Sequence, residues 1–161
     1  MTAPVSAGEP PAQRDEHFMR MALDLAQQAE AQGEVPVGAV VVHEGQVVGQ
    51  GWNQTITASD PTAHAEILAL RSAGEALGNY RLRDCDLYVT LEPCLMCVGA
   101  IVHARVARLV YGAADPKVGA VASQGSSLEL PGLNHRVKVT GGVMAEQCSE
   151  VLKQFFRARR G

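Results

Sequence analysis

The stretch from residue 87 to residue 97 reads LYVTLEPCLMC, and it indicates the fold class of the whole chain. Leu87 to Thr90 is a short apolar run of strand-forming residues, and Pro93 is typical of the first turn of a helix. We expect that helix to run through Ala104 and a second strand to cover Arg108 to Gly112. Two strands joined by one helix are expected to lie parallel in one sheet, which predicts an α/β protein.

Two strand-forming runs upstream of this unit flank a short turn. They cover Val37 to His43 and Gln46 to Trp52. Glu44 and Gly45, which lie between them, are typical of a two-residue hairpin turn. We therefore expect an antiparallel pair of strands at this end of the sheet.

Three helices and a fifth strand complete the expected fold. They are a helix from about Asp15, its potential cap, to Gly33, a helix from Thr62–His64 to Gly78, a strand near Arg136–Thr140 and a last helix from Val143 to Arg160. The sequence thus predicts a three-layer α/β/α fold with a central mixed five-stranded sheet.

The N-terminal segment, residues 1–13, contains three prolines and lacks the basic stretch and apolar core of a secretory signal. We interpret it as a disordered tail, followed by a single domain over residues 14–161. Two of the four cysteines stand three apart, a spacing typical of metal or redox thiols in a reducing compartment. With no apolar run long enough to cross a bilayer, we expect a cytoplasmic protein without membrane association.

Charge limits the kind of nucleic acid binding that we expect. The formal net charge is −3, which argues against indiscriminate binding to phosphate backbones. The exception is the C-terminal segment 155–160, which places three arginines beside two phenylalanines. This cluster is either a solvated helix end or a phosphate contact.

His64, Cys94 and Cys97 form a candidate zinc site. A catalytic zinc usually has three protein ligands and keeps a fourth position for water, whereas a structural zinc is closed by four. Three ligands therefore favour a catalytic site. Two thiolates offset part of the charge of the metal, and zinc still lowers the pKa of a bound water enough to supply hydroxide near neutral pH.

The spacing of these residues predicts how they meet. His64 and Glu66 are two apart, so they do not share the flank of a helix, but both can reach one centre from its N-terminal end. Cys94 and Cys97 are three apart behind Pro93 and share a face in a first turn. We expect two helix starts to converge on the metal, where their dipoles favour thiolate over thiol.

Glu66 is predicted to be the general base and acid rather than a metal ligand. A carboxylate beside the water can take its proton and return it to the ring nitrogen and then to the leaving ammonia. The alternative is a first-turn glutamate that only favours the helix dipole. The downstream Pro-Cys-x-x-Cys favours the catalytic role of Glu66, because a His-x-Glu paired with this motif is the signature of zinc-dependent nucleobase deaminases.

Other interpretations of the cysteines explain fewer residues. A redox pair of Cys94 and Cys97 leaves His64 and Glu66 without a role. A structural zinc would need a fourth ligand such as Cys85 or Cys148, and neither belongs to a second close-spaced pair. We expect both to be buried, and we expect the other histidines, which lack a partner at ligand spacing, to be surface or core residues: His17, His43, His103 and His135.

Beyond these motifs, the chain resembles the cytidine deaminase-like superfamily, specifically its bacterial tRNA-specific adenosine deaminases. The similarity covers almost the whole chain after the tail. It includes Glu34 to Ala39, Gly51 to Asn53, Asp60 to Ile67, Asn79 to Leu82, Leu87 to Cys97 without Leu95, Tyr111 to Ala113, Asn134 with His135, and Phe155 to Arg157. The resemblance implies a zinc-dependent homodimer, with one zinc per subunit, that hydrolyses adenosine to inosine at the wobble position of a tRNA anticodon.

Four further residues are candidate substrate contacts. The amide of Asn53 can donate to and accept from a base edge, or Asn53 is a capping or turn residue at the end of its strand. Val35 and Leu91 line the base site as apolar walls or are simply core residues. Asp115 either accepts a hydrogen bond from a ribose 2′-hydroxyl, which would favour RNA over DNA, or forms a turn before Pro116.

We expect only a few residues to supply positive charge or an aromatic stacking surface for RNA. Lys117 and the Arg157 to Arg160 cluster are candidate phosphate contacts, and Phe155 or Phe156 offers a stacking surface if it is not buried. Ala114 stands where related chains often carry a basic residue, which predicts weaker and more salt-sensitive capture of tRNA. The alternatives are a deaminase of a free base or nucleotide, such as guanine or deoxycytidylate, and a non-catalytic RNA-binding scaffold.

Overall fold

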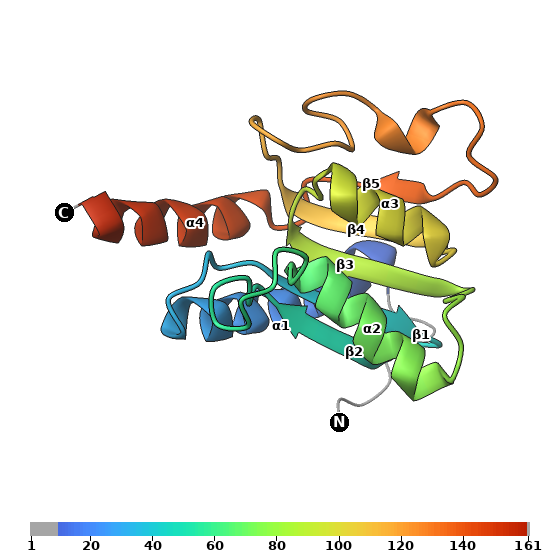
Figure 1. Cartoon of the computed structure of the whole chain (residues 1–161), viewed down its shortest axis with the longest axis horizontal. Coiled ribbons are helices and arrows are strands. Elements are labelled where there is room, and N and C mark those ends of the chain that lie inside the picture. The colour runs from blue at the N-terminus through green and yellow to red at the C-terminus, as the bar shows by residue number, and fades with distance from the viewer. Residues whose placement is uncertain (1–9, 161) are drawn as a thin grey trace.

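The computed structural model describes residues 10–160, so most of the predicted tail, residues 1–9, lies outside the described part of the chain. The elements follow the expected order (Figure 1). They are α1 (Pro11–Ala31), β1 (Gly38–His43), β2 (Gln46–Trp52), α2 (Ala65–Leu77), β3 (Cys85–Leu91), α3 (Leu95–His103), β4 (Arg108–Ala113), the short 3-10 helix η1 (Ser127–Glu129), β5 (Lys138–Thr140) and α4 (Ala145–Arg160).

The five strands form one mixed sheet in the order β2-β1-β3-β4-β5, which confirms the predicted architecture. β1 runs antiparallel to both β2 and β3, and β3, β4 and β5 are parallel. Since β2 and β3 both oppose β1, β2 runs in the same direction as β3 and β4. The carboxyl ends of these three strands therefore lie at one edge of the sheet, where α/β proteins usually place their functional residues.

Helices cover both faces of the sheet, as a three-layer fold requires (Figure 1). Alternate residues of the strands point to opposite faces. Val41 and Leu87 pack in the core beneath α2 and α3, whereas Val40 and Tyr88 pack in the core that α1 and α4 cover. Within residues 10–160, no helix has the length and the apolar composition that crossing a bilayer requires.

Two glycines of β2 allow α2 to lie directly on the strand. A Cβ atom at Gly49 would come within 2.4 Å of the carbonyl oxygen of Ala69, and one at Gly51 within 2.4 Å of that of Ala65. A side chain at either position would push the helix away from the sheet. This close approach brings the N-terminus of α2, and with it His64, to the carboxyl end of β2.

The hairpin and the ends of α2 agree with the sequence. Glu44 and Gly45 have positive φ angles of 51° and 76°, as a primed two-residue turn requires. His64 is the N-cap of α2, and Gly78 ends the helix in the left-handed conformation.

The prediction that α1 begins at Asp15 was wrong. The helix begins at Pro11, so residues 11–13, which we assigned to the disordered tail, form its first turn. Proline suits this position because it needs no N–H partner there. Asp15 is buried inside the helix instead of capping it.

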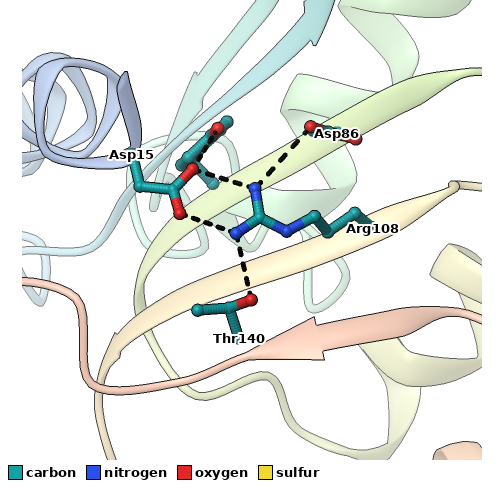
Figure 2. Close-up of polar contacts among 5 residues, drawn as sticks. Asp15, Asp86, Arg108 and Thr140 are labelled. Atoms are coloured by element: carbon teal, nitrogen blue, oxygen red, sulfur yellow. Dashed lines mark hydrogen bonds and ion pairs between the residues drawn. The ribbon is translucent and has the colours of Figure 1, made fainter. Parts of the chain in front are cut away.

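Asp15 faces the sheet and binds a guanidinium there (Figure 2). Arg108 Nη1 and Nη2 donate to its two carboxylate oxygens at 2.9 and 2.6 Å, and the Tyr88 hydroxyl donates at 2.8 Å. Arg108 also donates to Thr140 Oγ1 at 3.0 Å and lies 3.9 Å from Asp86. The pair thus ties α1 to β3, β4 and β5 on the face opposite α2 and α3.

Candidate metal centre and active site

Three side chains from two segments meet at the carboxyl edge of the sheet. The Nδ1 atom of His64 lies 3.6 Å from Cys94 Sγ and 3.5 Å from Cys97 Sγ. The three ligand atoms all lie within 4.8 Å of one another. One imidazole and two thiols at this separation are a donor set that suits tetrahedral zinc with one position left for another ligand.

Helix starts position these three residues, as their spacing predicts. His64 is the N-cap of α2 and Cys94 is the N-cap of α3, while Cys97 lies in the first turn of α3. α3 begins at Leu95 rather than at Pro93, so Pro93 precedes the cap instead of opening the helix. The positive ends of both helix dipoles therefore point at the cluster and favour negative charge on the sulfur atoms.

Protons in the cluster are shared unequally between the two thiols. Hydrogen bonds with Cys97 and His64 lower the pKa of Cys94 to about 3. The hydrogen bond with Cys94, together with burial, raises the pKa of Cys97, and the hydrogen bond with Cys94 raises the pKa of His64. A zinc ion binds thiolate and neutral imidazole, so its binding displaces these protons.

Glu66 lies in the first turn of α2 and is only 4% exposed. Burial raises the pKa of its carboxyl. A glutamate that only favours the helix dipole can do so from the surface, whereas a buried carboxyl with a shifted pKa is typical of a functional site. Glu66 stands outside the three-residue donor set, so its carboxylate is available for another task.

Asn53 connects the end of β2 to the start of α2. Its Oδ1 accepts a hydrogen bond from the backbone N–H of Ala65, the residue after His64, at 2.9 Å. Because the His64 side chain makes no capping bond, Asn53 satisfies one of the free N–H groups of this helix. The capping alternative is therefore observed, and the group that Asn53 can offer a ligand is its Nδ2.

The other predicted contacts differ in what they do. Val35 and Leu91 are half-buried and pack against the core. Asp115 Oδ1 accepts hydrogen bonds from the N–H groups of Lys117 and Val118 at 3.1 and 3.3 Å, so the turn-forming alternative is observed. Lys117 is exposed.

The aromatic and basic residues of the C-terminal segment 155–159 are partly packed against the fold and partly exposed. Phe155 is buried and Phe156 is 43% exposed. Arg159 donates to the carbonyl oxygen of Gly33 at 2.9 Å, and its Cζ lies 4.2 Å from the centre of the Phe155 ring. Arg159 thus holds α4 against the end of α1, while Arg157 is exposed.

The remaining cysteines and histidines do not join the metal cluster. Cys85 and Cys148 are buried, as predicted, and burial raises the pKa of each to about 11. His135 bonds to the carbonyl oxygen of Val106 at 2.7 Å, and His103 is exposed. Neither cysteine belongs to the donor set, so a four-ligand structural zinc finds no support among the described residues.

Two buried carboxylates, Glu34 and Glu92, were not predicted as functional residues from the sequence. They are 1% and 2% exposed. Glu34 accepts hydrogen bonds from the N–H groups of Ile56 and Thr57, and Glu92 accepts them from the segment 115–123. Both lie outside the strands, Glu34 before β1 and Glu92 directly after β3, and nothing in the local sequence distinguishes them from solvated carboxylates.

Comparisons with known proteins agree with this site. Residues 12–113 match the family described as the cytidine and deoxycytidylate deaminase zinc-binding region. The tRNA-specific adenosine deaminase of Haemophilus influenzae is 54% identical over 147 residues, which cover 91% of this chain and 85% of that protein. The Bacillus subtilis protein of the same name is 44% identical over 147 residues, covering 91% of each chain.

Solved structures extend the comparison to three dimensions. A structure from a study of A-to-I editing by tRNA:A34 deaminases at the wobble position of transfer RNA has a TM-score of 0.82 and 48% identity, and covers 84% of this chain and 99% of that one. A guanine deaminase from Nitrosomonas europaea has a TM-score of 0.74 and 25% identity, covering 96% of this chain and 97% of that one.

Proposed function

The chain belongs to the cytidine and deoxycytidylate deaminase family and, within it, to the tRNA-specific adenosine deaminases, and from this we propose its reaction. It hydrolyses adenosine to inosine at the wobble position of tRNA anticodons and releases ammonia. The observation that carries this conclusion is the 54% identity to a tRNA-specific adenosine deaminase over 91% of the chain. The cluster of His64, Cys94 and Cys97 supports the same reaction, because its donor atoms suit a zinc ion with one position left for water.

The residues that hold the metal in this proposal are His64, Cys94 and Cys97, with one zinc ion per chain. Their donor atoms match the preference of zinc for imidazole and thiolate. When bound, zinc supplies a Lewis acid that makes water acidic enough to act as a nucleophile near neutral pH.

Glu66 moves the protons in this proposal. Its carboxylate takes a proton from the attacking water while the oxygen bonds to the purine carbon that bears the amino group. It returns that proton to the adjacent ring nitrogen, then takes the second proton of the added water and gives it to the amino group. The carbon–nitrogen bond breaks, ammonia leaves and the carbonyl of inosine remains.

Substrate binding is assigned to residues around the metal cluster. Asn53, whose Oδ1 is engaged with Ala65, donates from Nδ2 to the edge of the base. Val35 and Leu91 supply apolar walls, and Asp115 accepts a hydrogen bond from a ribose hydroxyl with Oδ2, since Oδ1 is engaged in its turn. An anticodon loop suits such a site because its bases are already splayed from a helix.

We also propose that the protein forms a homodimer and acts in the cytoplasm. A groove of about 670 Å³ lies between α2 and α3, beside the 61% exposed Tyr80, and Leu95 of α3 is 65% exposed. A two-fold dimer buries this apolar surface against the same surface of a second copy. The tRNA substrate and the reduced ligand thiols favour the cytoplasm. We also propose that the chain from the start of α1 onward acts as a single domain.

The competing function is deamination of a free base, and the similarity to a guanine deaminase favours it. That similarity is 25% identical, against 48% for the tRNA deaminase structure. The deciding experiment incubates zinc-loaded protein with an adenosine-containing anticodon stem-loop and, separately, with adenosine, guanine and deoxycytidylate. We expect inosine only in the stem-loop, and conversion of the free compounds alone would overturn the proposal.

A further inference from the structure

The buried carboxylate of Glu92 binds both ends of one loop, the segment 115–123. Its Oε1 accepts hydrogen bonds from the N–H of Asp115 at 3.1 Å and from the hydroxyl of Ser123 at 2.5 Å. Its Oε2 accepts them from the N–H groups of Val121, Ala122 and Ser123 at 3.1, 2.8 and 3.0 Å. Five donors thus meet one charge, and both ends of the segment 115–123 are held at the same point.

Backbone contacts and shape reinforce this arrangement. The N–H of Glu92 donates to the carbonyl oxygen of Ala113, and the N–H of Ala120 donates to that of Pro93, both at 2.9 Å. A Cβ atom at Gly119 would lie 2.4 Å from the carboxyl carbon of Glu92. The loop therefore packs so closely on the carboxylate that it has no room for a side chain at residue 119.

The position of Glu92 makes this contact relevant to the site. Glu92 follows β3 and stands two residues before Cys94, whereas the loop follows β4 and begins at the same edge of the sheet. One end of the loop carries Asp115 and the exposed Lys117. The carboxylate therefore joins the segment that leads into the metal cluster to the segment that carries proposed RNA contacts.

We propose that Glu92 is a positioning residue for deamination, which holds the segment 115–123 as a fixed surface for the nucleotides that flank the edited base. The inference rests on the proposed function for its substrate. Glu92 contacts neither the base nor the metal in this account. Its loss is therefore expected to weaken RNA binding rather than proton transfer.

The test uses the zinc-loaded full chain with Glu92→Gln. The glutamine keeps the shape but replaces one acceptor oxygen with a donor that faces N–H groups. Since a hydrogen bond to a charged group contributes enough to change an equilibrium about tenfold, the amides of Val121, Ala122 and Ser123 should exchange hydrogen at least about tenfold faster. The KM for the anticodon stem-loop should rise about tenfold, with kcat and zinc content within about twofold of the wild type.

Three matched variants separate this effect from general destabilisation. Glu34→Gln alters another buried carboxylate that binds backbone N–H groups and should speed exchange at Ile56 and Thr57 but not at residues 121–123. Gly119→Ala should also speed hydrogen exchange in the segment 115–123, because the added methyl group has no room there, while the charge of Glu92 stays in place. Ser123→Ala removes one donor and gives a milder form of the same change if Glu92→Gln does not fold.

Unchanged exchange at residues 121–123 in Glu92→Gln would overturn the proposal. So would a loss of zinc and a fall in kcat at an unchanged KM, because Glu92 would then act through Cys94. A wild-type protein that deaminates no stem-loop would instead overturn the proposed function. The exchange rates would still report whether Glu92 holds the loop.

Discussion

Asn53 Oδ1 accepts a hydrogen bond from the backbone N–H of Ala65, and this 2.9 Å contact joins the end of β2 to the beginning of α2. Ala65 follows His64, so the contact that caps the helix also fixes the position of a proposed metal ligand. The same side chain is our candidate contact to the purine. Its structural and functional contributions are separable, because the helix uses the oxygen and the base would use the nitrogen.

Substitutions of Asn53 should separate these contributions. Asn53→Asp keeps the acceptor for Ala65 and removes the amide donor, so the free energy of unfolding should stay within about 0.5 kcal/mol while deamination is lost. Asn53→Ala should lose deamination and also about 1 kcal/mol of stability, the usual value of a helix cap. Denaturant unfolding and stem-loop assays check both, and an active Asn53→Asp would rule out donation from Nδ2.

Metal content should depend on two of the four cysteines. Cys97→Ser should abolish tight zinc binding because it removes one of the three proposed protein ligands. Cys148→Ala is the matched control, since Cys148 is equally buried but lies outside the cluster. Elemental analysis should find about one zinc per chain in the wild type and in the control.

Chelation should inactivate the wild type and added zinc should restore its activity. Full zinc occupancy in Cys97→Ser would contradict the ligand assignment.

Acid should weaken the contact between α1 and the sheet. Burial raises the pKa of Asp15, but the hydrogen bonds from Arg108 and Tyr88 outweigh it and hold the pKa below its usual range. A lowered carboxyl pKa contributes stability above the unfolded value of about 3.9 and loses it as pH falls through the folded value. Near neutral pH, Asp15→Asn should cost about 3 kcal/mol because it leaves Arg108 with only the more distant carboxylate of Asp86, at 3.9 Å, as a charged partner.

The measurement compares free energies of unfolding of the wild type and Asp15→Asn across pH. The difference between them should shrink as the pH falls below about 4. Asp24→Asn, an exposed position of the same helix, should change stability by less than about 0.5 kcal/mol. A difference that grows in acid would show that Asp15 does not stabilise the fold as a carboxylate.

Two of the three arginines near the C-terminus, Arg157 and Arg159, should respond differently to substitution. Arg157 is exposed, so Arg157→Ala should lower the salt dependence of stem-loop binding by about 0.7 in the logarithmic slope if it contacts a phosphate. Arg159 is engaged with Gly33 and Phe155, so Arg159→Ala should cost about 1 kcal/mol of stability. Binding titrations at several salt concentrations and thermal unfolding distinguish the two effects, and the reverse pattern would refute this division.

Local patterns were sufficient to predict most of the fold. Alternation and turn residues located β1 and β2, and the spacing of His64, Cys94 and Cys97 predicted two helix starts at one centre. These features depend on residues close together in the chain. The start of α1 was missed because its first turn has prolines instead of an apolar stripe, and because Asp15 resembles a cap in sequence.

Long-range contacts explain what the sequence did not predict. Asp15 and Arg108 are 93 residues apart, and the donors to Glu92 lie up to 31 residues after it. Nothing in the local pattern distinguishes a buried, hydrogen-bonded carboxylate from a solvated one. Likewise, the sequence left open whether Asn53 and Asp115 form turns or caps, and only the folded chain shows their backbone partners.

The most direct test of the account follows the oxygen of water into the product. Zinc-loaded protein is incubated with an adenosine-containing anticodon stem-loop in oxygen-18 water, and the nucleosides are analysed by mass spectrometry. We predict inosine at the wobble position with one heavy oxygen, and a loss of about a hundredfold or more in rate for zinc-loaded Glu66→Gln. Unmodified adenosine in the stem-loop, or full activity of Glu66→Gln with zinc bound, would contradict the account.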